Sequence, residues 1–175
     1  ICPQKCIKMV ENEYGYIYPE IDKSNCINCG MCKKVCPEIN SIDTNMPKEA
    51  YAMWIKSLEK RKMSTSGGAA RAFSEVIIED KGNVYGSCLK EGLNVEHICV
   101  NSLSEIDKIS GSKYVHSYIE NTYQKVKEDL LNDKIVLFVG TPCQVAGLRL
   151  YLGKGYDKLY TVDLICHGVP SQQFM

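Results

Sequence analysis

The sequence predicts a small α+β module followed by an α/β domain with a mixed, partly parallel sheet. Three observations predict it. Four cysteines crowd into residues 26–36, and the residues before them alternate like a short hairpin. Residues 135–165 then read as strand, helix and strand, the order of a right-handed crossover between parallel strands. We expect the first module to cover residues 1–40, a linker to cover 41–49, and the α/β domain to occupy 50–175 and to be incomplete at its C-terminus.

Composition excludes several classes of protein. Lysine plus arginine and aspartate plus glutamate both number 21, so net charge gives no reason to expect nucleic acid as a partner. No apolar run reaches the roughly 18 residues of a membrane span. Six of the ten cysteines fall within the first 36 residues at metal-ligand spacing. This pattern favours metal-bound or free thiols in a reducing cytoplasm over a disulfide scaffold.

The cysteine run explains the expected chemistry of the first module. Cys26, Cys29 and Cys32 are separated by two residues each, and Cys36 follows after three more, directly before Pro37. This is the bacterial ferredoxin run for a 4Fe-4S cluster. A tight loop with a cysteine at every third position can offer thiolates to several corners of a cubic cluster. A structural zinc site is the alternative, but zinc ligands usually come as two well-separated pairs. The run therefore predicts a ferredoxin-like module.

Cys2-Pro3 repeats the ending Cys36-Pro37 and indicates a second run whose first three cysteines lie upstream of Ile1. In two-cluster ferredoxins the cysteine before the proline ligates the other cluster. We therefore expect one complete 4Fe-4S cluster, and a second one implied by the upstream residues. Cys6 falls outside the spacing and is interpreted as a packing thiol. The expected ligands of the complete cluster are Cys2, Cys26, Cys29 and Cys32, and Cys36 is expected to serve the second cluster. Strands at 7–10 and 16–18 form the expected hairpin.

Near its start, the α/β domain has a loop that could bind a ligand. Tyr51–Ile55 has strand character, and Ser64–Gly68 is a hydroxyl-rich and glycine-rich loop ahead of a helix that begins near Ala69. Such a loop offers free N–H groups and the positive end of a helix dipole to a phosphate. It can equally serve only as a helix cap. The residues alone leave both interpretations open.

The middle of this domain is expected to supply an antiparallel pair and two helices. Strands at 84–88 and 95–100 are joined by a turn at Gly92–Asn94, and His97 lies on the second strand as a structural residue. Ser102 and Glu105 have the spacing of a capping box for a short helix. The apolar face of the next helix is expected to carry Tyr123, Val126, Leu130 and Leu131.

Two further cysteines follow the strands of the crossover. Cys143 opens the helix after Gly140-Thr141-Pro142, and Cys166-His167 follows the second strand. The carboxyl ends of parallel strands meet at one sheet edge, where ligands of α/β proteins bind. Three interpretations remain open: the two thiols bind a metal or face a redox cofactor, Cys143 is a nucleophile assisted by His167, or both thiols are simply buried.

The motifs together resemble a known family. In chain order they are the cysteine run, Ser64–Gly68, Gly111–Val115, Gly140–Gln144 and Cys166–Ser171. They are similar to the coenzyme F420 hydrogenase/dehydrogenase beta-subunit family, in a form with a fused N-terminal ferredoxin domain. The resemblance covers essentially all 175 residues. Thr65 stands where a serine is usual, and His116 where glutamine is expected.

The resemblance implies an iron–sulfur flavoprotein oxidoreductase. Such subunits bind FAD and pass electrons between 4Fe-4S clusters and a deazaflavin or another small redox substrate, beside a redox partner protein or subunit. The implied catalytic residues are Cys143 and Cys166, as candidate ligands of a cluster near the flavin. The implied flavin-contacting residues are Ser66, Gly67, Gly68, Ser112, Lys113 and Thr141.

Two other functions remain open at this point. The chain could be a non-catalytic electron-transfer protein whose α/β domain docks a partner, or a cysteine hydrolase that uses Cys143 with His167. The cysteine run favours redox chemistry, because an electron that enters through a cluster needs an acceptor.

Overall fold

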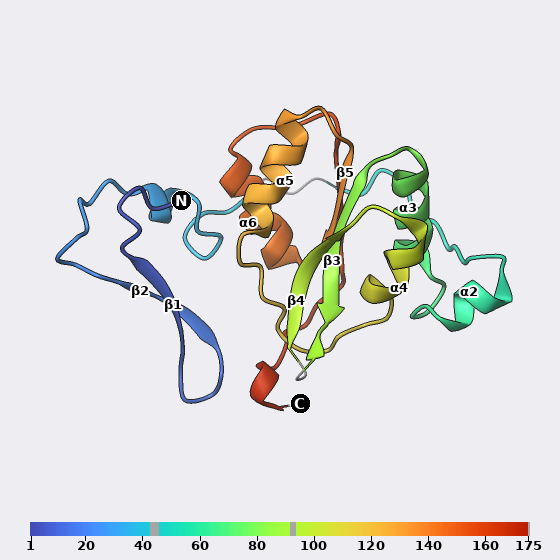
Figure 1. Ribbon diagram of the computed structural model, residues 1–175, viewed down its shortest axis with the longest axis horizontal. Coiled ribbons are helices and arrows are strands. Elements are labelled where there is room, and N and C mark those ends of the chain that lie inside the picture. The colour runs from blue at the N-terminus through green and yellow to red at the C-terminus, as the bar shows by residue number, and fades with distance from the viewer. Residues whose placement is uncertain (43–45, 92–93, 175) are drawn as a thin grey trace.

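The computed structural model describes residues 1–42, 46–91 and 94–174 (Figure 1). Its two parts are a hairpin module and a four-stranded sheet with helices on both faces. The predicted fold class is thereby confirmed. The expected turn at Gly92–Asn94 and the middle of the expected linker, at 43–45, fall on residues outside this description.

The hairpin module consists of β1 (Ile7–Glu11), β2 (Ile17–Ile21) and one turn of helix, α1 (Met31–Lys34). β1 and β2 pair antiparallel, with Ile7 opposite Ile21. The second strand continues through Pro19, which lies opposite Met9, although the sequence suggested that it ends before the proline. Proline is tolerated there because each strand of a two-stranded sheet is an edge.

The larger sheet has the strand order β4-β3-β5-β6. β3 (Asn83–Leu89) and β4 (Val95–Val100) are antiparallel, whereas β5 (Val136–Gly140) runs parallel to both β3 and β6 (Leu159–Asp163). α6 (Pro142–Leu152) connects β5 to β6 as the expected crossover. Gly140 pairs with Asp163, so the two strands end side by side.

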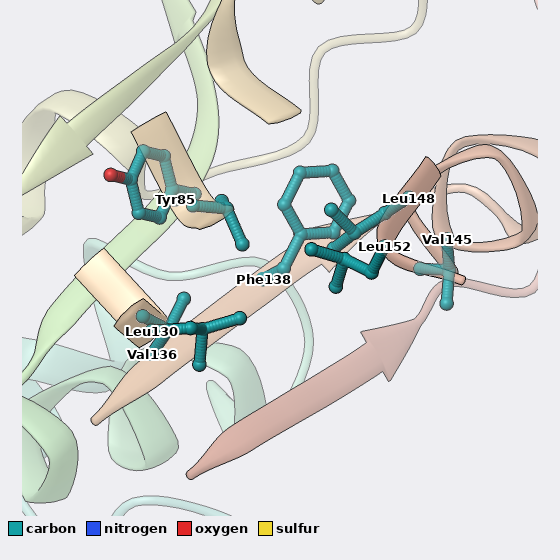
Figure 2. Packing of buried hydrophobic residues seen from close by; sticks show 8 residues of the cluster. Tyr85, Leu130, Val136, Phe138, Val145, Leu148 and Leu152 are labelled. Atoms are coloured by element: carbon teal, nitrogen blue, oxygen red, sulfur yellow. The ribbon is translucent and has the colours of Figure 1, made fainter. Parts of the chain in front are cut away.

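Helices cover both faces of this sheet. α5 (Thr122–Leu131) and α6 pack on one face, and α3 (Ala69–Glu79) and α4 (Ile106–Ile109) pack on the other. Side chains alternate along β5, because successive residues of a strand point to opposite faces. Phe138 therefore packs toward α5 and α6 (Figure 2), whereas Leu137 packs toward α3 and α4. Short turns complete the fold: α2 (Leu58–Lys62), η2 (Leu103–Glu105) and η3 (Gln172–Phe174).

Two local predictions were wrong. Tyr51–Ile55 is not a strand, because its backbone is held to the Ser64–Gly68 loop instead of a sheet: the N–H of Ile55 donates to the carbonyl oxygen of Gly67 at 2.9 Å. Leu131 lies 64% exposed at the end of α5 instead of on its buried face. Within the described ranges, no helix is both long and apolar enough to cross a membrane.

Candidate cluster and cofactor site

The cysteine run folds as a loop around α1. Asn28 and Gly30 both take left-handed backbone conformations, with φ of 53° and 73°. These two residues turn the chain between Cys26, Cys29 and Cys32. The side-chain amide of Asn40 then closes the loop by donating to the carbonyl oxygens of Lys33, at 2.6 Å, and Cys36, at 3.0 Å. Cys29 is exposed, and the other cysteines of the run are partly exposed.

Cys2 lies in a setting suited to a cluster thiolate. The backbone N–H of Cys6 is the main cause that lowers the pKa of Cys2, and the N–H groups of Gln4 and Lys5 act in the same direction. Hydrogen bonds to sulfur are one way in which proteins stabilise cluster ligands and tune their potentials. The backbone around Cys2 is therefore of the kind that stabilises a cluster thiolate.

Cys6 is buried, as expected of a packing thiol, and its Sγ lies 3.4 Å from the Sγ of Cys2. Hydrogen bonding to Cys2, then burial, and then the nearby Cys26 raise the pKa of Cys6 to about 11. Cys2 and the start of the cysteine run thus both lie beside Cys6. Across residues 1–42, 46–91 and 94–174, the side chains form no compact group of three or more His, Cys, Asp or Glu around one point. Among the described residues, the candidate cluster ligands are therefore not arranged around one common point.

Two loops that the sequence marked as flavin-contacting lie together. The N–H of Ser112 donates to the hydroxyl oxygen of Thr65 at 2.9 Å. Behind them, Arg71 of α3 pairs with Asp107 of α4 at 2.5 Å and so ties together the helices that carry the loops. The structure thus joins the Ser64–Gly68 and Gly111–Tyr114 loops at one place.

The glycines of the first loop also have a packing role. A Cβ atom on Gly67 would collide with the carbonyl oxygen of Met53. Gly68 has a φ of 80°, and a Cβ there would lie 2.7 Å from Cδ1 of Ile55. Ser66 likewise has a positive φ, of 56°. Close approach to the Met53 backbone is thus a sufficient reason for Gly67, and the positive φ together with the Ile55 side chain is one for Gly68, whether or not a ligand binds there.

A cavity of about 400 Å³ lies next to the second loop. It is lined by Leu89, Val95, Ser112, Lys113, Tyr114, Val115, Pro170 and Phe174. Burial lowers the pKa of Lys113, and its ammonium donates to the carbonyl oxygen of Ser110 at 2.8 Å. Ser112 and Lys113, two of the predicted flavin-contacting residues, therefore border an actual cavity. Ser66, Gly67, Gly68 and Thr141 are not among its lining residues.

Cys143 lies in the first turn of α6, which follows β5, and Cys166 lies in the loop after β6, as the sequence predicted. The two segments are held together by a hydrogen bond from the N–H of Leu164 to the carbonyl oxygen of Gly140, at 2.9 Å. Both thiols are exposed, which excludes the interpretation that they are buried packing residues. Thr141 Oγ1 lies 3.1 Å from Cys143 Sγ, and the N–H of Gly168 donates to Cys166 Sγ at 3.4 Å.

Three polar residues that the sequence left unassigned organise this region. Gln144 accepts a hydrogen bond from the N–H of Thr141 at 3.0 Å and donates to the carbonyl oxygen of Ser117 at 3.2 Å. The Thr-x-x-Gln spacing of a capping box was the available signal. Ser171 is fully buried, and Gln172 bonds backbone groups 77 residues away. Neither has a local sequence signal.

His97 is structural, as expected. Its Nε2 lies 3.1 Å from the carbonyl oxygen of Val139, which can only accept, so this nitrogen carries the proton. Nδ1 then accepts from the hydroxyl of Ser117 at 2.8 Å. The ring stacks on Phe138 with centroids 5.2 Å apart. Burial lowers the pKa of His97 to about 4.

Comparisons with known proteins agree with this arrangement. Residues 133–175 match the family that comprises the C terminus of the coenzyme F420 hydrogenase/dehydrogenase beta subunit, and residues 18–42 match the 4Fe-4S binding domain. The chain is 41% identical over 49 residues to ketoisovalerate oxidoreductase subunit VorC of Methanothermobacter marburgensis, covering 27% of this chain and 62% of that protein. It is 32% identical over 56 residues to a ferredoxin-like protein of Sinorhizobium fredii, covering 32% and 54%. The matches span little more than half of each relative.

The cysteine loop and the match over residues 18–42 both indicate that this part of the chain is similar to 4Fe-4S binding domains. The chain thus carries sequence similar to a 4Fe-4S binding domain ahead of sequence similar to the C terminus of the coenzyme F420 hydrogenase/dehydrogenase beta subunit. The resemblance that the sequence motifs suggested is thereby confirmed.

Proposed function

We propose that the chain is part of an iron–sulfur flavoprotein oxidoreductase that passes electrons between a 4Fe-4S cluster and FAD. Cys2, Cys26, Cys29 and Cys32 would hold the cluster, and Cys36 would serve a neighbouring one. Bound, the cluster supplies one-electron transfer and the flavin supplies hydride chemistry. A redox partner protein and a deazaflavin or another small redox substrate would stand at the two ends of the path.

One observation carries this proposal. Ser171, which belongs to the segment bordering the cavity, donates a hydrogen bond to the backbone carbonyl of Tyr14 in the hairpin, at 2.5 Å. The turn of the hairpin is therefore held by a buried hydroxyl of the segment that borders the cavity. This contact would keep the cluster module and the α/β domain together as one unit.

The cavity has room for part of FAD, such as one of its planar ring systems. Its volume of about 400 Å³ lies within the range of small-molecule pockets, roughly 300–1,000 Å³. Ser112 and Lys113 contribute polar groups to an otherwise largely apolar wall. The ammonium of Lys113 would face the negative charge of a pyrophosphate or a reduced flavin.

Cys143 and Cys166 are the proposed second redox-active pair. Cys143 lies in the first turn of α6, at the positive end of the helix dipole. We also propose a reducing compartment such as the cytoplasm, because the spacing of Cys26, Cys29, Cys32 and Cys36 is that of cluster ligands and not of a disulfide scaffold. Within the described part of the chain, Cys143 hydrogen-bonds Thr141 and not His167, so the geometry does not favour a cysteine hydrolase.

Cofactor analysis of the full-length protein, prepared without oxygen, tests the proposal. We expect iron and acid-labile sulfide in equal amounts, together with a flavin that acid releases and chromatography identifies as FAD. Iron and sulfide without flavin, even after incubation with FAD, would replace the proposal by a non-catalytic electron-transfer protein. A preparation with neither cofactor whose activity depends on Cys143 would point to hydrolysis.

A further inference from the structure

Residues 170–174, here called the strap, contact both the cavity and the hairpin. Pro170 and Phe174 line the cavity. Between them, Ser171 bonds the carbonyl oxygen of Tyr14, and a Cβ placed on Gly15 would lie 2.5 Å from the side chain of Gln173. The strap therefore presents different residues to two different neighbours. Figure 1 shows this red C-terminal segment beside the turn that joins β1 and β2.

Gln172 fixes the strap to the α/β domain. Its amide nitrogen donates to the carbonyl oxygens of Val95 and His116, both at 2.8 Å, and its amide oxygen accepts from the N–H of Val95 at 3.0 Å. The N–H of His116 donates to the carbonyl oxygen of Pro170 at 2.9 Å. Because both ends of the Gln172 amide are hydrogen-bonded, the strap has a defined position.

A second contact reinforces the docking of the hairpin. The hydroxyl of Tyr118, which follows the residues bonded to the strap, donates to the carboxylate of Glu11 at 2.7 Å. Gly15 at the hairpin turn has a φ of 74° and leaves room for Ser171 and Gln173. The hairpin is thus held at two points, one buried and one at the surface.

Two aromatic rings lie at the edge of the cavity. Phe174 and Tyr114 line it, yet they are 69% and 77% exposed. A planar ligand in the cavity would cover these two rings, since aromatic faces favour stacked partners. It would then restrict the strap through Phe174, one residue from the contact between Gln173 and Gly15.

We propose that the strap couples the cavity to the cluster module, so that a planar aromatic ligand in the cavity and the docked hairpin stabilise each other. The inference rests on the proposed function, which supplies FAD as that ligand. Coupling of two binding events is reciprocal: whatever fixes the hairpin raises the affinity for the ligand by the same factor. Ser171 and Tyr118 are positioning residues in this scheme and need not touch the ligand.

Hydrogen exchange of the full-length, cluster-loaded protein tests the coupling. FAD is expected to slow exchange in the peptide that covers residues 12–17. Ser171→Ala should speed that exchange about three- to tenfold without FAD, the effect of one lost hydrogen bond, and weaken FAD binding by a similar factor. Ser104→Ala, on the exposed turn before α4, is the matched control and should change neither.

A surface variant guards against misfolding of the Ser171 variant. Tyr118→Phe removes only the hydroxyl bonded to Glu11 and should have the same direction of effect, whereas Tyr160→Phe on β6 should have none. Unchanged hairpin exchange in both the Ser171 and Tyr118 variants overturns the docking role. Variants that speed exchange while FAD affinity stays constant overturn the coupling. If FAD fails to bind wild-type protein, the proposed function and the coupling fall together, and the exchange of the variants still decides the docking.

Discussion

Thr65 accepts a hydrogen bond from the backbone N–H of Ser112 across 47 residues of sequence, at 2.9 Å. This contact joins the Ser64–Gly68 loop to the Gly111–Tyr114 loop, which the sequence could identify only as two separate motifs. The first loop precedes α3, and the second leads into the wall of the cavity. The hydroxyl of Thr65 therefore helps to set where Ser112 and Lys113 stand.

Thr65→Val, which keeps the side-chain shape and removes the acceptor, should weaken binding of FAD. The N–H of Ser112 loses its partner, and one hydrogen bond of this kind corresponds to about a three- to tenfold change in affinity. Titration of the cofactor-depleted protein with FAD, followed by flavin fluorescence, measures it. Thr161→Val on β6, whose hydroxyl bonds Arg149, is the control. Equal affinities of the wild type and both variants for FAD would show that the Thr65 contact does not affect binding in the cavity.

Serine substitutions of the cysteines separate ligands from packing thiols. Cys29→Ser should remove the complete cluster with little harm to the fold, because Cys29 is exposed in its loop. Cys6→Ser should keep the cluster, since Cys6 is buried beside Cys2 as a packing residue. Iron content and the visible absorbance of anaerobic protein give the comparison. If Cys6→Ser lost the cluster and Cys29→Ser kept it, Cys6 would be the ligand and Cys29 would not.

The pH dependence of stability should report on His97. Burial lowers its pKa from 6.5 to about 4, so the folded state holds this ring neutral. Stability is then fully present above pH 6.5 and is lost as the pH falls toward 4, because the unfolded chain binds the proton more readily. The difference corresponds to about 3 kcal/mol in the free energy of unfolding.

Urea unfolding at several pH values between 4 and 7 measures this loss. His97→Gln should flatten the dependence, at a cost in stability at pH 7 from the lost contacts with Ser117 and Val139. His116, whose pKa is also lowered by burial, lies close enough to disfavour charge on His97, as does Lys113. His116→Gln should therefore keep most of the slope. A wild-type slope that survives in His97→Gln would assign the acid sensitivity elsewhere.

The sequence predicted those parts of the fold that depend on local periodicity. Phe138 and Leu137 belong to a continuous apolar run, which indicates a strand buried on both faces, and the structure confirms it. Tyr51–Ile55 has the composition of a strand but lacks a ladder partner, and composition cannot supply one. A segment forms a strand only where its backbone can pair with a neighbouring strand, whatever its own composition.

The candidate site was predictable to the same degree. The spacing of the cysteine run identified the cluster loop, and the crossover placed Cys143 and Cys166 at one edge. The role of Gln172 depends on the backbone of Val95 and His116, and no local pattern points to partners so far away in the chain. Ser171 is a comparable case, because its partner Tyr14 belongs to the other module.

Gln144 offers a prediction that links stability to the position of Cys143. Its side-chain oxygen, Oε1, accepts from the backbone N–H of Thr141. Its side-chain nitrogen, Nε2, donates to the backbone carbonyl oxygen of Ser117. Gln144→Leu removes both bonds and leaves two backbone groups without these partners, so the free energy of unfolding should fall by about 2–4 kcal/mol. Gln144→Glu keeps an acceptor for the N–H of Thr141 but replaces the donor to Ser117 by an oxygen that faces the Ser117 carbonyl oxygen, so it should also lower stability.

The two variants should therefore differ at Cys143. The loop of Thr141 keeps its shape in Gln144→Glu, so the alkylation rate of Cys143 should stay near the wild-type value. In Gln144→Leu the start of α6 loses its cap, and the same rate should change severalfold, because the backbone that carries the Cys143 thiol is no longer held in place. Mass spectrometry of the Cys143 peptide after timed alkylation measures both rates, with Cys166 in the same samples as the internal reference. Identical rates in the two variants would show that Gln144 stabilises α6 without positioning Cys143.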